Sequence, residues 1–235
     1  KPALPRPAAD RDVSQPAGGT ARQFILPLPL PASSDRADFL EDASNAEALA
    51  WLDEPGRWPG GRLALFGPAG VGKSHLARAL AAERAWRLIE GPALRGLPEP
   101  APGGTVLDDA DAVAEERALL HLVNLCAERG EHLLLIGREA PARWRVALPD
   151  LASRLKATTA IGIGRPGDAL LGALLAKHFA DRQLRVAPEV QAWLLTRLSR
   201  EAGALAEAAA RLDRAALAAS APITRALARA ALAGW

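Results

Sequence analysis

The chain has 235 residues, of which 49% are apolar and 24% charged, with a formal net charge of only +2. This balance excludes a strongly charged disordered protein and is typical of a folded globular one. No apolar run approaches the roughly 20 residues that a membrane span requires, and the first residues lack the apolar segment of a secretion signal. A single cysteine, Cys126, rules out an internal disulfide. We therefore expect a cytoplasmic protein that does not enter a membrane.

The first 30 residues have no pattern of a folded domain. Residues 1–22 contain four prolines and a Gly-Gly pair without hydrophobic periodicity, which predicts a flexible tail. A short apolar segment, residues 23–30, follows. Prolines at 27, 29 and 31 exclude a helix and most strand pairing. The segment is therefore expected to be extended and either to pack on its own domain or to dock on another surface.

Residues 31–166 alternate between short apolar runs and helical patterns. Ser44 and Glu47 have the spacing of a capping box at the start of the first helix. Helices are predicted over 44–53, 73–84 and 115–129, and strands over 62–66, 86–90, 105–108, 132–136 and 158–163. Strands that alternate with helices indicate a mainly parallel sheet that is covered on both faces. This region is predicted to be an α/β domain.

The pattern becomes wholly helical after residue 166. Four helices are predicted over 168–182, 188–199, 201–219 and 222–233. Pro188 and Pro222 stand at helix starts, where a missing N–H costs nothing. Residues 167–235 are therefore predicted to be an all-helical subdomain.

One motif indicates phosphate binding. The segment between the first predicted strand and the next helix matches G-x-x-x-x-G-K-[ST] in full: Gly67, Pro68, Ala69, Gly70, Val71, Gly72, Lys73 and Ser74. Its glycines let successive N–H groups turn toward the phosphates, and the helix adds its positive end. Lys73 is placed for the β- and γ-phosphates and Ser74 for Mg²⁺. The alternative, an incidental Gly-rich turn, has less support because a strand precedes the motif and a helix follows it.

A second apolar strand ends in two acids. Asp108 follows Thr105-Val106-Leu107 and is expected to hold Mg²⁺, commonly through water. Asp109 could orient the attacking water. Paired acids also occur in ordinary solvent-exposed turns. Because this chain has a complete P-loop, the role in holding Mg²⁺ is favoured.

These motifs resemble a known family. The stretches 39–45, 67–76 and Asp108-Asp109 are similar to the AAA+ domain of the bacterial replication initiator DnaA. The resemblance implies an AAA+ P-loop core with a parallel sheet, followed by a helical lid. It also implies bound ADP or ATP with Mg²⁺, and nucleotide contacts from Leu40, Asn45 and His75.

Three further stretches, 148–155, 23–28 and 211–215, narrow the resemblance to the Hda family of DnaA-related regulators, in its alphaproteobacterial form. Members of that family bind the DNA-loaded sliding clamp through a peptide of the type Q-L-x-L-P-L. In this chain the pattern is occupied by Gln23, Phe24, Ile25, Leu26, Pro27 and Leu28, with Phe where Leu is usual. This favours docking on a partner for the apolar segment, and any contact with DNA is expected to be indirect, through the clamp.

Arg154 matches the arginine finger of the Hda family. The resemblance implies that it acts in trans on the ATP of DnaA, so that DnaA becomes its inactive ADP form. The expected function is therefore negative regulation of the initiation of chromosomal replication. The alternative role of Arg154 is that of an ordinary arginine on a helix surface.

Two sensor positions depart from the family pattern. The residue after the fourth strand is Arg138 or Glu139 instead of a small polar or acidic group, and the lid position of the sensor arginine is Gly203. Arg200 could substitute if its helix rotates. Loss of the arginine removes a charge that holds the γ-phosphate. We expect bound nucleotide, with ADP favoured, to act as a structural switch, and we expect the chain to hydrolyse ATP poorly by itself.

Other interpretations remain. A helicase-loader ATPase predicts intact sensors and a surface for single-stranded DNA, a DnaA fragment should continue into a DNA-binding domain beyond Trp235, and a clamp-bound adaptor needs no arginine finger. The oligomeric state, including a homodimer or a higher oligomer, stays open.

Overall fold

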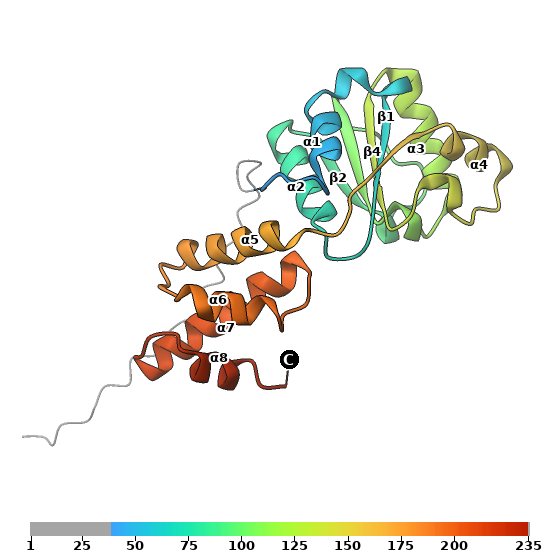
Figure 1. Ribbon diagram of the computed structural model, residues 1–235. Coiled ribbons are helices and arrows are strands. Elements are labelled where there is room, and N and C mark those ends of the chain that lie inside the picture. Colours follow the sequence, from blue (N-terminus) through green and yellow to red (C-terminus); the bar gives the residue numbers. More distant parts are fainter. Residues whose placement is uncertain (1–38, 235) are drawn as a thin grey trace, which may run out of the picture. The chain divides into compact units, whose positions relative to one another are not determined.

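The computed structural model describes residues 39–234. The predicted tail, residues 1–22, and the predicted clamp-binding peptide, residues 23–30, lie outside this part. The described core contains a five-stranded parallel sheet in the order β2-β3-β4-β1-β5 (Figure 1). Its strands are β1 (Arg62–Phe66), β2 (Arg87–Glu90), β3 (Gly104–Asp108), β4 (His132–Gly137) and β5 (Thr159–Gly162).

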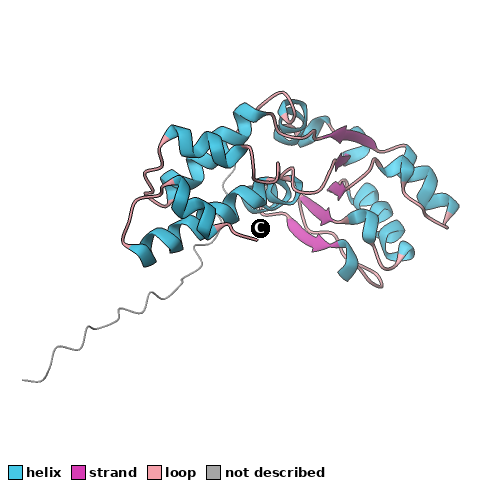
Figure 2. Ribbon diagram, turned by 60° about the horizontal axis from the view of Figure 1, so that its bottom comes forward, coloured by secondary structure: helices cyan, strands magenta, loops and turns pink. Residues whose placement is uncertain are grey.

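Helices cover both faces of the sheet (Figure 2). The core helices are α1 (Ala46–Asp53), α2 (Lys73–Glu83), α3 (Glu116–Arg129) and α4 (Pro149–Lys156). Short 3₁₀ segments connect them: Pro55–Arg57, Pro59–Gly61, Gly91–Ala93, Ala110–Ala112 and Pro141–Arg143. The predicted α/β architecture is confirmed.

Strand alternation divides the core into two apolar layers. Leu134 and Ile136 of β4 face the layer that contains α1 and α2, whereas Leu133 and Leu135 face the layer with α3 and α4. Successive side chains of a strand point to opposite faces, so a strand covered on both sides is apolar throughout. This explains the continuous apolar run that predicted β4.

The predicted capping box at the first helix is wrong. The Ser44 hydroxyl and backbone N–H both donate to the Asp42 carboxylate, and the backbone N–H of Asn45 donates to the Asp42 carbonyl. A nearby carboxylate offers Ser44 a local acceptor that competes with capping. As a result α1 begins at Ala46, without a side-chain cap.

The lid consists of α5 (Asp168–Asp181), α6 (Pro188–Leu195), α7 (Ala202–Ala219) and α8 (Arg225–Ala231). The second and fourth are shorter than predicted. Its own apolar core includes Leu175, Phe179 and Leu212, all fully buried. The helical lid predicted from the sequence is confirmed. In the described part of the chain, none of the helices is long and apolar enough to cross a membrane.

Leu134→Ala tests the packing of the sheet. Leu134 is 0% exposed on the central strand β4, so truncation leaves a cavity and is expected to lower the free energy of unfolding by about 2–5 kcal/mol. Leu97→Ala is the matched control, because Leu97 is 78% exposed; its effect should stay within about 0.5 kcal/mol. Urea denaturation measures both, and equal effects would contradict the assignment of the core.

Candidate nucleotide-binding site

The phosphate loop spans the turn between β1 and α2, residues 67–72. Gly70 has φ +76°, which an L side chain rarely adopts. At Gly67 a Cβ would lie 2.3 Å from the Ile163 carbonyl oxygen, on the segment after β5. Both glycines are therefore required by the path of the loop between β1 and α2.

Lys73 is held inside this loop. Its Nζ donates to the carbonyl oxygens of Gly67 and Pro68, both at 2.8 Å. Burial lowers the pKa of Lys73, while the acids Asp108, Asp111 and Asp109 oppose that shift. The ammonium group is thus held among carbonyls and near three carboxylates, in position to turn toward a phosphate.

Ser74 and Asp108 come together from different elements. Ser74 is the second residue of α2, and its hydroxyl donates to Asp108 Oδ1 at 3.1 Å, at the end of β3. Asp109 follows with a left-handed backbone, φ 50°, and its N–H also donates to Asp108 Oδ1. Hydroxyl and carboxylate oxygens suit Mg²⁺. Among residues 39–234 no cluster of three or more His, Cys, Asp or Glu could hold a metal ion.

The segment before α1 lies against the loop and the start of α2. A Cβ on Gly72 would lie 3.1 Å from the Phe39 ring, and Phe39 stacks on His75 with ring centroids 6.1 Å apart. Asn45 is buried; its Nδ2 donates to the Leu40 carbonyl at 2.9 Å, and its Oδ1 accepts from Asp42. Asn45 therefore fixes the shape of the segment through its own hydrogen bonds, and places Leu40 and Phe39.

The same segment is joined to the region that leads into the lid. Asp42 Oδ2 accepts from the N–H of Gly167, and the Ser44 carbonyl accepts from the N–H of Gly164. Burial raises the pKa of Asp42, but the hydrogen bonds from Ser44 and Gly167 outweigh it and leave this pKa below its usual value. A charged Asp42 thus links residues 39–45 to the start of α5.

The lid contacts the phosphate loop through the start of α7. The N–H of Ala202 donates to the Gly70 carbonyl at 3.1 Å, and the Glu201 side chain packs on Gly70, 2.5 Å from the position a Cβ would take. Gly203 is exposed, with open space around it. Arg200 pairs with Asp168 at 2.6 Å. Arg200, which could substitute for the sensor arginine if its helix rotated, has its guanidinium paired at the start of α5.

At the end of β4 the other departure from the family pattern is visible. The backbone N–H of Arg138 donates to Asp111 Oδ2 at 2.7 Å. Burial chiefly lowers the pKa of Lys73, and the positive charge of Arg138 adds to that lowering. Sequence reasoning missed Asp111, since nothing in its local pattern shows that the turn after β3 brings it beside β4.

Arg154 lies on α4, outside the phosphate loop. Its side chain is 37% exposed, with Nε 3.3 Å from Asp150 Oδ1. Together with Asn124, Ala127 and Glu128 of α3 it lines a hollow of about 340 Å³. Burial, and to a smaller extent the positive charge of Arg154, lowers the pKa of Arg62.

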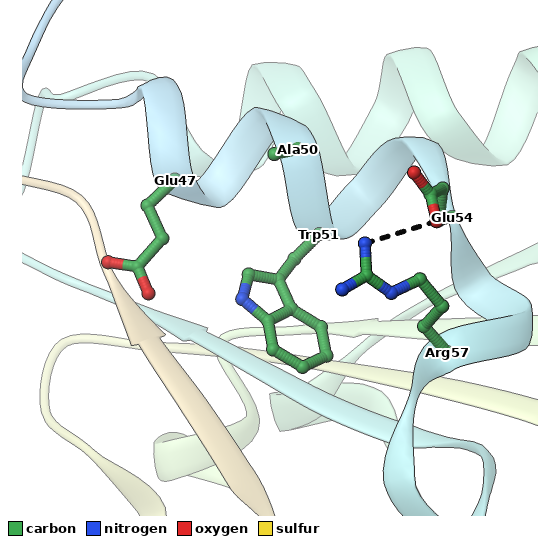
Figure 3. Close-up of a pocket in the computed structure, with 5 residues that line it drawn as sticks. All are labelled: Glu47, Ala50, Trp51, Glu54 and Arg57. Carbon is green, nitrogen blue, oxygen red and sulfur yellow. Dashed lines mark hydrogen bonds and ion pairs between the residues drawn. The ribbon is translucent and has the colours of Figure 1, made fainter.

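A second hollow, of about 160 Å³, lies along the outer side of α1 (Figure 3). The guanidinium carbon of Arg57 lies 5.9 Å from the Trp51 ring centroid, and Arg57 pairs with Glu54 at 3.2 Å. None of its lining residues belongs to the predicted site. It is a mainly apolar recess in which Arg57 and Glu54 pair with each other, and we do not assign it to the nucleotide.

Comparison with known proteins identifies the fold and the family that the helical lid matches. Residues 168–232 match the family described as "Hda, lid domain". Domain III of DnaA from Thermotoga maritima superimposes with a TM-score of 0.72 at 16% identity, covering 87% of this chain and 98% of that one. AMPPCP-bound DnaA from Aquifex aeolicus superimposes with a TM-score of 0.62 at 18% identity, covering 77% of this chain and 64% of that one. The RuvB Holliday junction branch migration motor of Thermotoga maritima superimposes with a TM-score of 0.62 at 14% identity, covering 85% of this chain and 71% of that one.

The core and lid together define an AAA+ domain: a parallel-stranded P-loop core followed by a helical subdomain. The match over residues 168–232 identifies that subdomain as an Hda lid. The chain is therefore similar to the Hda family in its lid and to DnaA in its fold, which agrees with the resemblance that the sequence motifs indicated.

Gly70→Ala tests the contact between loop and lid. The Cβ would require a strained backbone and would collide with Glu201, so we expect nucleotide affinity to fall at least about tenfold, the equivalent of 1–2 kcal/mol of left-handed strain. Titration with a fluorescent ADP analogue measures the loss. Gly56→Ala is the control, because Gly56 has no neighbour within 4 Å and no positive φ. Unchanged affinity in Gly70→Ala would show that the loop does not hold the phosphates.

Proposed function

We propose that this protein is a negative regulator of the initiation of chromosomal replication, which docks on the sliding clamp and stimulates ATP hydrolysis by DnaA. The observation that carries the proposal is the Hda-type lid, residues 168–232, on a core with the fold of DnaA. A regulator of this kind would act in the cytoplasm, with DNA contacted through the clamp.

Bound nucleotide, ADP or ATP, would organise the protein. The solved DnaA from Aquifex aeolicus binds AMPPCP, and this chain has a complete phosphate loop with Lys73 inside it. Ser74 and Asp108 would hold Mg²⁺, which would neutralise phosphate charge. Because α7 is hydrogen-bonded to Gly70, nucleotide in the loop would also fix the lid.

Intrinsic hydrolysis by this chain would be weak. Gly203 provides no cation at the lid position, and Arg200 is paired with Asp168. Asp109 is exposed at the turn after β3 and could still orient a water, but the charge developing on the γ-phosphoryl group would lack the lid arginine. The protein then contributes to catalysis mainly through the site it completes in trans.

Arg154 would supply that contribution. As an arginine finger, its guanidinium would lie beside the γ-phosphate of ATP bound to DnaA and stabilise the charge of the transition state while water attacks the phosphorus. The position of Arg154 supports this role: it is partly exposed on α4 and is held by Asp150, an exposed partner from which it can turn. A clamp-bound adaptor would not need this arrangement, whereas a helicase loader would be expected to keep its sensor residues.

Arg154→Ala is expected to leave the fold intact and to abolish stimulation of the DnaA ATPase, because an arginine finger supplies about 10³–10⁵ in rate in other systems. The measurement is DnaA ATP hydrolysis with clamp-loaded DNA. Lys156→Ala, an exposed cation of the same helical turn, should stimulate as wild type does. Stimulation that survives in Arg154→Ala would assign the finger to another residue and favour the adaptor.

Gln23→Ala tests the docking peptide, Gln23, Phe24, Ile25, Leu26, Pro27 and Leu28. The amide is expected to orient the peptide on the clamp while Leu26 and Leu28 fill an apolar pocket, so affinity for the clamp should fall at least about tenfold, typical of losing a hydrogen bond at a buried interface. Surface plasmon resonance on immobilised clamp measures it. Gln15→Ala, in the predicted tail, is the control. Equal binding by both variants would contradict the peptide assignment.

A further inference from the structure

Arg78 lies beside the carboxylate that is expected to hold Mg²⁺. It follows Ser74 by four residues in α2, and residues at this spacing share one face of a helix. Its Nη2 lies 3.8 Å from Asp108 Oδ2 and 3.8 Å from Glu90 Oε1. The hydroxyl and the guanidinium therefore approach Asp108 from the same helix face, one on each carboxylate oxygen.

Two neighbouring strands bring their terminal acids to this guanidinium. Glu90 and Asp108 are paired in register at the ends of β2 and β3. The side chain of Asp108 is only 2% exposed, whereas that of Glu90 is 50% exposed. Like charges that face each other across strands are unfavourable, and Arg78 offsets both charges.

Burial of Asp108 makes this neighbour important for nucleotide binding. A carboxylate shielded from water keeps an electrostatic influence that solvent does not screen, and it repels an incoming phosphate. Mg²⁺ removes that repulsion in P-loop proteins. Lys73 also interacts with Asp108, but a bound phosphate would draw Lys73 toward itself and leave Arg78 beside the carboxylate.

We propose that Arg78 is a resident counter-cation of Asp108, which lets the phosphate loop bind a nucleoside phosphate with little dependence on Mg²⁺. The Arg78 guanidinium offsets the charge of Asp108, as Mg²⁺ would, without coordinating the phosphates. Mg²⁺ must therefore compete with Arg78 for the Asp108 carboxylate. This inference rests on the nucleotide binding proposed above and adds the regulation of that site by the divalent ion.

The ion pair between Arg78 and Asp108 would not by itself support a counter-cation role for Arg78. An exposed pair at 3.8 Å contributes little to stability, and the Arg78 side chain is 51% exposed. The argument depends on the buried member, Asp108, because its charge has few ways to be solvated and is fixed by hydrogen bonds from Ser74 and Asp109. Arg78 is therefore a positioning residue for charge at the site, and its loss should be visible in metal dependence.

The experiment compares the affinity for a fluorescent ADP analogue in Mg²⁺ and in EDTA, for wild type and Arg78→Ala. Chelation should weaken binding by wild type by less than about threefold, and binding by Arg78→Ala by at least about tenfold, because one unscreened charge at about 4 Å is worth a kcal/mol or more near a protein surface. The alanine variant keeps a strong helix former in α2, and circular dichroism checks its fold.

Three variants separate this effect from a general loss of charge. Arg84→Ala removes an arginine close to the end of the same helix, whose Nη2 donates to the Asp53 carbonyl, and should respond to EDTA as wild type does. Arg78→Lys retains the cation and should keep most of the metal independence. Adding Asp108→Asn to Arg78→Ala should abolish the tenfold sensitivity, since the repelling charge is gone.

Two outcomes would contradict the inference, and they differ. If wild type and Arg78→Ala bind the analogue but lose affinity by the same factor in EDTA, Arg78 has no counter-cation role and the nucleotide site stands. If wild type binds no analogue in either condition, the nucleotide function itself fails, and this inference fails with it.

Discussion

The parallel order of the three inner strands is the constraint on which the site depends. Because β3, β4 and β1 run in the same direction, their carboxyl ends lie at one edge of the sheet, with β4 between the other two. The phosphate loop leaves β1, Asp108 ends β3 and Arg138 follows β4. This parallel pairing brings residues more than thirty positions apart, such as Ser74 and Asp108, to hydrogen-bond distance.

Charge is distributed unequally between the phosphate loop and the lid position at Gly203. Near the loop, Asp108, Asp109 and Asp111 influence Lys73 together, and Glu201 packs on Gly70. The lid provides no cation at Gly203. In the proposed function, backbone N–H groups and Lys73 would hold the inner phosphates, and few charges would be left for the outermost one. Such a site suits bound nucleotide as a structural element better than rapid turnover.

The sequence predicted those parts that depend on local pattern. The phosphate loop, the strand that ends at Asp108 and the helical lid follow from spacing and periodicity within short windows. The capping role of Ser44 was wrong because Asp42, two residues earlier, captures its hydroxyl and N–H. Glu201 on Gly70, Asp111 beside Arg138 and Arg78 between Glu90 and Asp108 could not be predicted, since each contact joins elements whose relative placement is set by packing of the whole sheet.

Arg154 and the phosphate loop lie on separate elements. A regulator could therefore hold nucleotide in its own loop and use the arginine on the nucleotide of another subunit. The phosphate loop lies at the ends of β1 and β3. Arg154 lies on α4, with α3 beside it and Asp150 as its ion-pair partner. An arginine on a separate element can serve a nucleotide in another subunit while its own loop retains a different nucleotide. Weak hydrolysis in cis then has an advantage for the proposed function: the nucleotide that links the loop to α7 persists, and the lid keeps its place while Arg154 acts on DnaA.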